Sequence, residues 1–149
     1  MAKVRRIDNL DDLRQLAKIR DVVYFELHGR RRDGFETDPK VEQGTNVSQL
    51  TEGNRLTTRF RTLLQGGDGT YVVDLAVVFD FPEKFTFDPK VLQVFAGTVA
   101  FPIAHPFIRE ALRDMASKLG LKRPILQLLP PEGIELEEEP SGSQETEAP

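Results

Sequence analysis

The chain of 149 residues contains no cysteine and only two histidines. Without cysteine there can be no disulfide, no thiolate catalysis and no cysteine-ligated zinc, and the composition fits a reducing compartment. The two histidines, His28 and His105, lie far apart in the sequence, and neither has a second ligand at a metal-binding spacing. We therefore expect ordinary histidines, no metal and no cofactor.

Catalytic and nucleotide-binding motifs are missing as well. No GxSxG motif presents an activated serine, so the sequence offers no hydrolytic triad. The glycines of the segment 66–69 do not have the GxxxxGK[ST] spacing of a phosphate-binding loop, and they lie between two predicted strands, where a turn is needed. These absences favour a protein that is not an enzyme and does not bind ATP.

Long apolar runs are scarce. We find no run approaching the roughly 18 residues that a membrane-spanning helix requires. The N-terminal stretch acquires Asp8, Asp11 and Asp12 before any apolar block forms, so it does not have the pattern of a secretory signal. The sequence predicts a soluble cytoplasmic protein without membrane insertion.

Negative charge is concentrated at the C-terminal end. The net charge is −4, yet the segment 132–149 holds seven glutamates and no basic residue, while the rest of the chain holds 17 acidic and 20 basic residues. A segment this acidic, and rich in proline, serine and glycine, is expected to be disordered. It is interpreted as a solubilising tail, with binding of a basic partner as the alternative. Residues 1–131 are then the length of one domain.

Four segments have the pattern of β-strands: 20–31, 41–50, 56–64 and 71–81. The last two alternate apolar and polar residues around a glycine-rich link, which predicts a long antiparallel hairpin. The segment 41–50 is more polar and fits an edge strand. A crossover loop over 32–40 is expected before it, because that segment consists largely of turn-forming residues.

Helical patterns flank these strands. At the N-terminal end, Asn9 or Asp8 can cap a short helix over about 9–18. After the strands, Asp88 followed by Pro89 predicts the start of a second short helix, with aspartate as the cap and proline at the first helical position.

A longer amphipathic helix follows. Pro102 and Pro106 are expected to interrupt the helical pattern, so that this main helix runs from Pro106 to Gly120, its C-terminal glycine. Strands followed by helices predict an α+β fold, a four-stranded antiparallel sheet with a long helix packed on one face.

Several arginines could form a basic surface. Arg59 and Arg61 lie on one face of a predicted strand, and Arg30, Arg31 and Arg32 form a short cluster at the end of another. Clustered guanidinium groups can bind phosphates. Exposed strands commonly carry arginine, however, and an acidic tail on the same chain would compete, so we expect no nucleic-acid partner.

The stretch 101–130 resembles the signature of the SecB family of protein-export chaperones. A helix start of the type "phe-pro-tyr-x-arg-glu" is matched by Pro106, Phe107, Arg109 and Glu110. A later phrase of the type "gly-x-pro-pro-leu-x-leu-x-pro" is matched by Gly120, Pro124, Leu126, Leu128 and Pro130. This resemblance implies a SecB-like fold and a homotetramer formed as a dimer of dimers.

The resemblance also implies where unfolded clients bind. In that family the crossover loop and the segment after the long helix line an apolar groove, which here makes candidates of Phe35, Leu121, Ile125, Leu126 and Leu128. Phe101, Phe107 and Ile108 are expected in the core or in a subunit interface. The apolar stretch 125–129 favours this view, because the polar tail after it cannot cover it.

The functional hypothesis is an ATP-independent holdase that binds unfolded or nascent preproteins for export, with a SecA-type motor as a possible partner. One alternative is a SecB-like chaperone of a toxin–antitoxin system, with an antitoxin as partner. The other is an oligomeric adaptor, without chaperone activity, that binds one folded protein.

Overall fold

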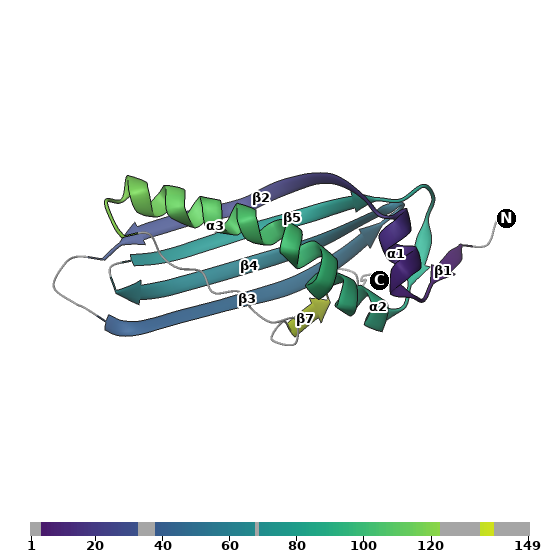
Figure 1. Ribbon diagram of the computed structural model, residues 1–149, viewed down its shortest axis with the longest axis horizontal. Coiled ribbons are helices and arrows are strands. Elements are labelled where there is room, and N and C mark those ends of the chain that lie inside the picture. The colour runs from purple at the N-terminus through teal and green to yellow at the C-terminus, as the bar shows by residue number, and fades with distance from the viewer. Residues whose placement is uncertain (1–3, 33–37, 68, 123–134, 139–149) are drawn as a thin grey trace, which may run out of the picture.

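Long antiparallel strands form one layer of the structure, and an apolar helix lies across one of its faces (Figure 1). The computed structural model describes residues 4–32, 38–67, 69–122 and 135–138. In chain order the elements are β1 (Arg5–Ile7), α1 (Leu10–Leu16), β2 (Lys18–Arg31), β3 (Asp38–Glu52), β4 (Arg55–Gly67), β5 (Gly69–Asp80), β6 (Phe85–Phe87), α2 (Pro89–Phe95), the π-helical segment η1 (Ala96–Ala100), α3 (Phe101–Lys118) and β7 (Glu135–Glu138).

The main sheet has the strand order β2-β5-β4-β3-β7. Its first four strands are antiparallel, and β4 and β5 form the predicted hairpin, in which Leu56 pairs with Phe79 and Leu64 with Tyr71. The polar segment 41–50 lies within β3, next to the hairpin. The predicted fold class, a four-stranded antiparallel sheet with a long helix on one face, is therefore confirmed.

Side-chain alternation sends one face of the sheet into the core. Val73, Leu75 and Val77 of β5 are fully buried, as are Leu56 and Phe60 of β4. The helix completes this core through two edge-to-face ring contacts, Phe60 with Phe101 at 5.6 Å and Phe79 with Phe95 at 4.9 Å between ring centres. Such ring pairs stabilise a core beyond the area that they bury.

The helix that covers the sheet is continuous from Pro89 to Lys118, which corrects the prediction of two helices separated by prolines. Proline has no amide proton, so it removes a hydrogen bond from a helix. The π-helical turn η1 ends at Ala100, two residues before Pro102, and Pro106 lies inside α3. Looser i→i+5 bonding in η1 lets the chain pass the first proline without ending the helix.

The end of the helix follows the prediction. Gly120 has φ +70°, and the amides of Gly120 and Leu121 donate to the carbonyls of Ser117 and Ala116. This is the paired hydrogen bonding of a Schellman C-cap, which glycine favours because it adopts positive φ without strain.

By length and composition, the helix from Pro89 to Lys118 could cross a membrane, since its most apolar 18-residue window has a mean hydropathy of 1.6. We expected no apolar run near the length of a membrane-spanning helix. That expectation is wrong, because Pro102 and Pro106 do not divide this helix. A helix that covers a protein core can have the same length and composition. Here 39% of that window is buried within the structure.

The N-terminal residues add a small second sheet that the sequence did not predict. β1 pairs in parallel with β6, so that Arg5 lies beside Phe85 and Ile7 beside Phe87. The short helix α1 follows, capped by the Asn9 side chain, which accepts a hydrogen bond from the Asp12 amide at 2.9 Å.

The acidic tail 132–149 was predicted to be disordered, but part of it forms a strand. Its residues Glu135–Glu138 form β7, which pairs in parallel with Asn46–Gln49 of β3. Backbone pairing to an open sheet edge requires no apolar side chains, so composition alone does not detect such a strand. The remaining tail residues lie outside the described residues.

One buried polar group in the core has no partner. Among the described residues, His105 Nε2 is buried without a hydrogen bond, and the ring lies 5.5 Å from that of Phe101. Burial lowers the pKa of His105 below its ordinary value of 6.5, and the charge of nearby Arg109 lowers it further. The folded protein therefore holds this imidazole neutral.

This burial predicts a loss of stability in mild acid. Below about pH 6.5 the unfolded chain takes up a proton that the folded core resists, so the free energy of unfolding falls until the folded-state pKa is passed. We expect His105→Leu to lose part of this pH dependence. Urea denaturation at pH 7.5 and 5.5 measures it, with His28→Leu as the control; equal pH dependence in wild type and His105→Leu would contradict the account.

Candidate binding site

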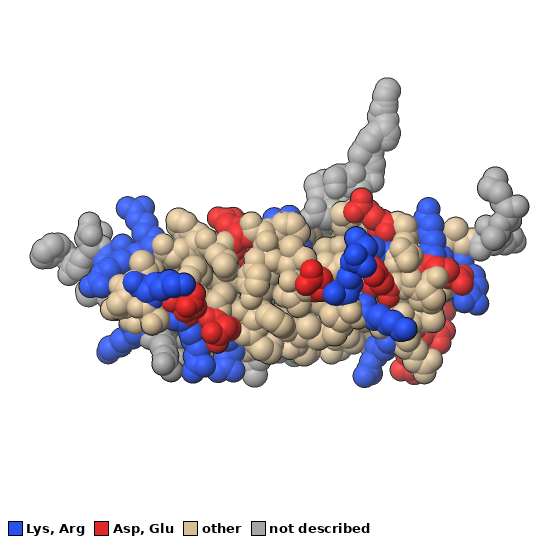
Figure 2. All heavy atoms as spheres, turned by 90° about the horizontal axis from the view of Figure 1, so that it is seen from above, with Lys and Arg blue, Asp and Glu red and all other residues tan. Residues whose placement is uncertain are grey.

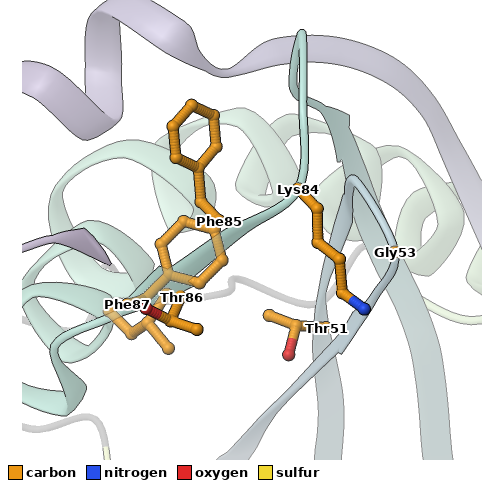
Figure 3. Close-up of a pocket in the computed structure, with 7 residues that line it drawn as sticks. Thr51, Gly53, Lys84, Phe85, Thr86 and Phe87 are labelled. Carbon is orange, nitrogen blue, oxygen red and sulfur yellow. The ribbon is translucent and has the colours of Figure 1, made fainter. Parts of the chain in front are cut away.

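An open hollow of about 240 Å³ lies where the β3–β4 turn meets β6 and α2 (Figure 3). It is lined by Thr51, Gly53, Lys84, Phe85, Thr86, Phe87 and Leu92. In Figure 3, residues 85–87 form one wall, and the Lys84 side chain extends towards the turn at Gly53. The hollow therefore combines an aromatic wall with a single cationic group.

Hydrogen bonds hold the elements around the hollow in place. The Asn54 amide side chain donates to the Phe81 carbonyl at 2.9 Å, and the Phe81 amide donates to the Asn54 carbonyl at 2.8 Å. Gln49 Nε2 donates to the Leu92 carbonyl at 3.2 Å, which ties β3 to α2. The turn and the helix start are therefore fixed relative to each other.

The wall of β6 is fixed from the other side by the N-terminal strand. The Asp88 amide donates to the Ile7 carbonyl at 3.0 Å, and the Asp88 carboxylate pairs with Arg6. The Arg5 guanidinium lies 5.5 Å from the centre of the Phe85 ring. Asp88 begins α2, as predicted, but its side chain pairs with Arg6 and makes no capping hydrogen bond.

The hollow has no set of groups for catalysis. Its lining has two threonines and one lysine as polar side chains, and no carboxylate or imidazole that could act as a general base. A shallow aromatic hollow beside a strand suits the apolar side chain of an extended polypeptide.

A second apolar surface follows the edge strand β2. Ile19, Tyr24, Phe25 and Leu27 are between 41% and 56% exposed, although strands at sheet edges usually carry charge. Figure 2 views the molecule from the side on which β2 lies, and uncharged atoms cover its middle while charged side chains gather towards both ends. An apolar edge of this kind marks an interaction surface.

Arginines on the open face of the sheet are engaged with carboxylates. Arg59 makes two hydrogen bonds to Asp74, at 2.8 and 2.7 Å, and Arg61 bonds both Asp74 and Glu26. The Arg59 guanidinium also lies 4.4 Å from the centre of the Phe25 ring. These bonds occupy the two arginines that had been weighed as a phosphate-binding face.

The buried member of this cluster is Asp74, whose side chain is fully inaccessible. Burial raises the pKa of Asp74, but hydrogen bonds and charge from Arg59 and Arg61 outweigh it, so the pKa lies below its ordinary value. The carboxylate is ionised at neutral pH, and it holds the two arginines along the sheet.

Among the groove candidates, Phe35, Ile125, Leu126 and Leu128 lie outside the described residues. Leu121 is described, partly buried, and packs at the edge of the core. Its Cδ1 would lie 2.9 Å from a Cβ atom added to Gly69, so the two residues approach each other closely. Leu121 is therefore beside the start of β5, and the hollow is near the β3–β4 turn at the opposite end of the hairpin.

The three residues expected in the core or an interface have different surroundings. Phe101 is 6% exposed and Ile108 is fully buried, and both face the sheet within the core. Phe107 is 41% exposed on the outer side of α3. Val94, on the same continuous helix, is 47% exposed.

Sequence reasoning missed the residues of the hollow. Phe85 and Phe87 lie in a three-residue strand, too short for a periodic pattern, and their position depends on pairing with β1 about 80 residues earlier. A usable signal was the run of phenylalanines at positions 79, 81, 85 and 87, which exceeds what one strand end needs. Figure 3 shows two of these residues in the wall.

Comparison with known proteins gives the class of the molecule. No family model matches the sequence. A curated relative, the SecB-like chaperone SmegB of Mycolicibacterium smegmatis, is 28% identical over 131 residues, which cover 88% of each protein. Among solved structures, the Mycobacterium tuberculosis Rv1957 SecB-like chaperone, in complex with a ChAD peptide from the Rv1956 HigA1 antitoxin, matches with a TM-score of 0.68. That match has 18% identity and covers 80% of this chain and 96% of the other, so it shows the fold.

The architecture defines a protein of SecB-like fold with exposed apolar surfaces. The chain is similar to SecB-like chaperones in sequence over 88% of its length and in fold, which agrees with the resemblance found in its sequence.

Proposed function

We propose that this protein is an ATP-independent holdase, which binds unfolded polypeptides through exposed apolar surfaces and keeps them from aggregating. The observation that carries the proposal is the aromatic hollow beside strand β3 in a SecB-like fold. Apolar burial of roughly 25 cal/mol per Å² supplies the attraction. Several such sites on one oligomer raise the effective concentration of the next client segment.

The hollow and the predicted groove residues would act together as client contacts. Phe85, Phe87 and Leu92 line the first, near the β3–β4 turn. The second is proposed at the other end of the sheet, where Leu121 packs and where β2 ends and β3 begins. Phe35, Ile125, Leu126 and Leu128 are assigned to it from the family resemblance. A long extended client could contact both.

Filling the hollow should weaken client binding. Thr51 is exposed on the rim, so Thr51→Trp places an indole where a client side chain would lie. We expect affinity for a reduced and carboxymethylated, permanently unfolded protein to fall about tenfold, which corresponds to about 1.4 kcal/mol. Fluorescence anisotropy of the labelled client measures it. Thr57→Trp, the same change on the opposite face of the sheet, is the control, and equal affinity of both variants would contradict this assignment.

The segment after the long helix gives a separate test. Replacing Ile125 and Leu126 by serine removes two large apolar side chains from the proposed groove, and we expect client affinity to fall several-fold while the circular dichroism spectrum stays unchanged. Val4→Ser, which removes an exposed apolar residue at the other end of the chain, should bind normally. Unchanged binding by the double variant would remove these residues from the site.

We also propose that the protein assembles as a homotetramer, a dimer of dimers. The exposed apolar residues of β2, together with Val94 and Phe107 on the outer side of the helix, support this assembly. Each of these surfaces would be covered by a second copy, because a soluble monomer rarely leaves an apolar edge strand open.

A charge on the β2 edge should break this assembly. Leu27 is 53% exposed on β2, and Leu63 is 42% exposed on the central strand β4. Leu27→Asp is expected to give a species of lower mass in sedimentation equilibrium, because a carboxylate would be buried in the interface. Leu63→Asp makes the same change away from the edge. If both variants keep the wild-type mass, β2 does not form the interface.

An antitoxin is a second candidate client. The Rv1957 chaperone, which shares this fold, is in complex with a ChAD peptide from an antitoxin. The affinities for an antitoxin peptide of that type and for an unfolded preprotein can be compared by titration. Tighter binding of the antitoxin peptide would support a role in a toxin–antitoxin system. The reverse order would support protein export, in the cytoplasm, with hand-over to a SecA-type motor.

A further inference from the structure

The chain's own acidic segment occupies the outer edge of the sheet. β7 pairs in parallel with β3, in the register Asn46 with Glu135, Val47 with Leu136, Ser48 with Glu137 and Gln49 with Glu138. Without β7, β3 would be the edge strand, because its other neighbour in the sheet is β4. In Figure 1, β7 lies beside β3 on the side away from β4.

This pairing lies directly beside the proposed client site. Gln49, the last residue of β3 paired with β7, donates a hydrogen bond to the carbonyl of Leu92, which lines the hollow. Thr51, on the rim, is two residues further along β3, about 7 Å at the usual strand rise. An extended segment paired with 46–49 therefore lies within two residues of the hollow. β7 occupies the backbone positions that such a segment would use.

β7 has the composition of a weak occupant. Three of its four residues are glutamate, which is depleted in strands, and Asn46, Val47, Ser48 and Gln49 carry no charge that could attract them. Backbone pairing with β3 attaches it to the sheet. A client segment with the same backbone and large apolar side chains would gain more from apolar burial than a segment that is three-quarters glutamate can.

Covalent attachment compensates for this weakness. Twelve residues, 123–134, connect the described end of the helix segment to β7. A covalent connection of this length can give an effective concentration on the order of millimolar, enough for a weak segment to occupy a neighbouring edge. The tail can therefore cover the edge when no client is present and still be exchanged.

We propose that β7 is an intramolecular competitor, which covers the β3 edge in the empty protein and leaves when an extended client segment pairs there. This inference rests on the proposed holdase function. The competition would raise the affinity that a client needs in order to bind, so that only segments with sufficient apolar character displace the tail. It would also release the acidic tail from the sheet when a client binds.

The size of the effect follows from mass action. If β7 covers the edge for about two thirds to nine tenths of the time, it weakens apparent client affinity by about three- to tenfold. Removing the pairing between β7 and β3 should therefore raise the apparent client affinity by the same factor. Arg61 and Arg59 of β4 pair with Asn46 and Ser48, one strand away from Glu135 and Glu137, so high salt should lower this factor.

Full-length variants test the competition. Leu136→Pro with Glu137→Pro disrupts β7, because consecutive strand residues direct their amides to opposite sides, and proline cannot donate. Gln144→Pro with Glu145→Pro is the control, since it introduces two prolines and removes one glutamate elsewhere in the tail. The probe is the same reduced and carboxymethylated unfolded protein, titrated at low and high salt.

We expect the β7 variant to bind this probe about three- to tenfold more tightly than the wild type, and the control variant to bind as the wild type does. Equal affinity of all three proteins would overturn the competition and leave the holdase function standing. Weaker binding by the β7 variant would overturn it too, because the tail would then assist the client. If none of the three binds the probe, the holdase function itself is contradicted, and the competition with it.

Hydrogen exchange tests the pairing without a client. Backbone amides of residues 46–49 that bond to β7 should be protected in the wild type and in the control, and should exchange faster in the β7 variant. On addition of the probe to the wild type, residues 135–138 should lose protection. Protection that is the same in all three proteins, or that β7 keeps after the client binds, would overturn the proposal.

Discussion

The packing of one apolar helix across one face of the sheet is the interaction on which the rest of the structure depends. Phe95 and Phe101 lie against Phe79 and Phe60, and the helix turns through a π-helical segment between them. This contact buries the inner face of the strands and positions Leu92 beside the β3–β4 turn. The helix leaves uncovered the two edges of the sheet and its own outer side. These are the surfaces through which the protein can bind other molecules.

The two edges differ in a way that suits two tasks. β2 exposes large apolar side chains along its length, which suits the permanent cover by another copy of the chain that we propose. β3 is more polar and is covered by a short acidic strand with little apolar content. A cover of that kind can be exchanged, so a client and the tail can use the same backbone groups in turn. Binding of this type needs neither a catalytic residue nor a nucleotide.

Much of the fold could be predicted because its patterns are local. The alternation in 56–64 and 71–81 predicted the hairpin, and Gly120 predicted the end of the helix. Proline failed as a guide, because a π-helical turn accommodates Pro102 within a continuous helix. The hollow and β7 could not be predicted, since both depend on pairing between distant segments, Arg5 with Phe85 and Val47 with Leu136. A three-residue strand and a run of glutamates carry no pattern that reveals such partners.

The central claim is that this protein recognises the unfolded state of its clients. The most direct test is calorimetric titration with one slow-folding secretory precursor, presented once as the unfolded chain and once as the native protein. The account predicts heat of binding with the unfolded chain and none with the native protein, since a native client has buried the apolar segments that the hollow and the β3 edge would contact. Binding to the native form alone, or to neither form, would contradict it.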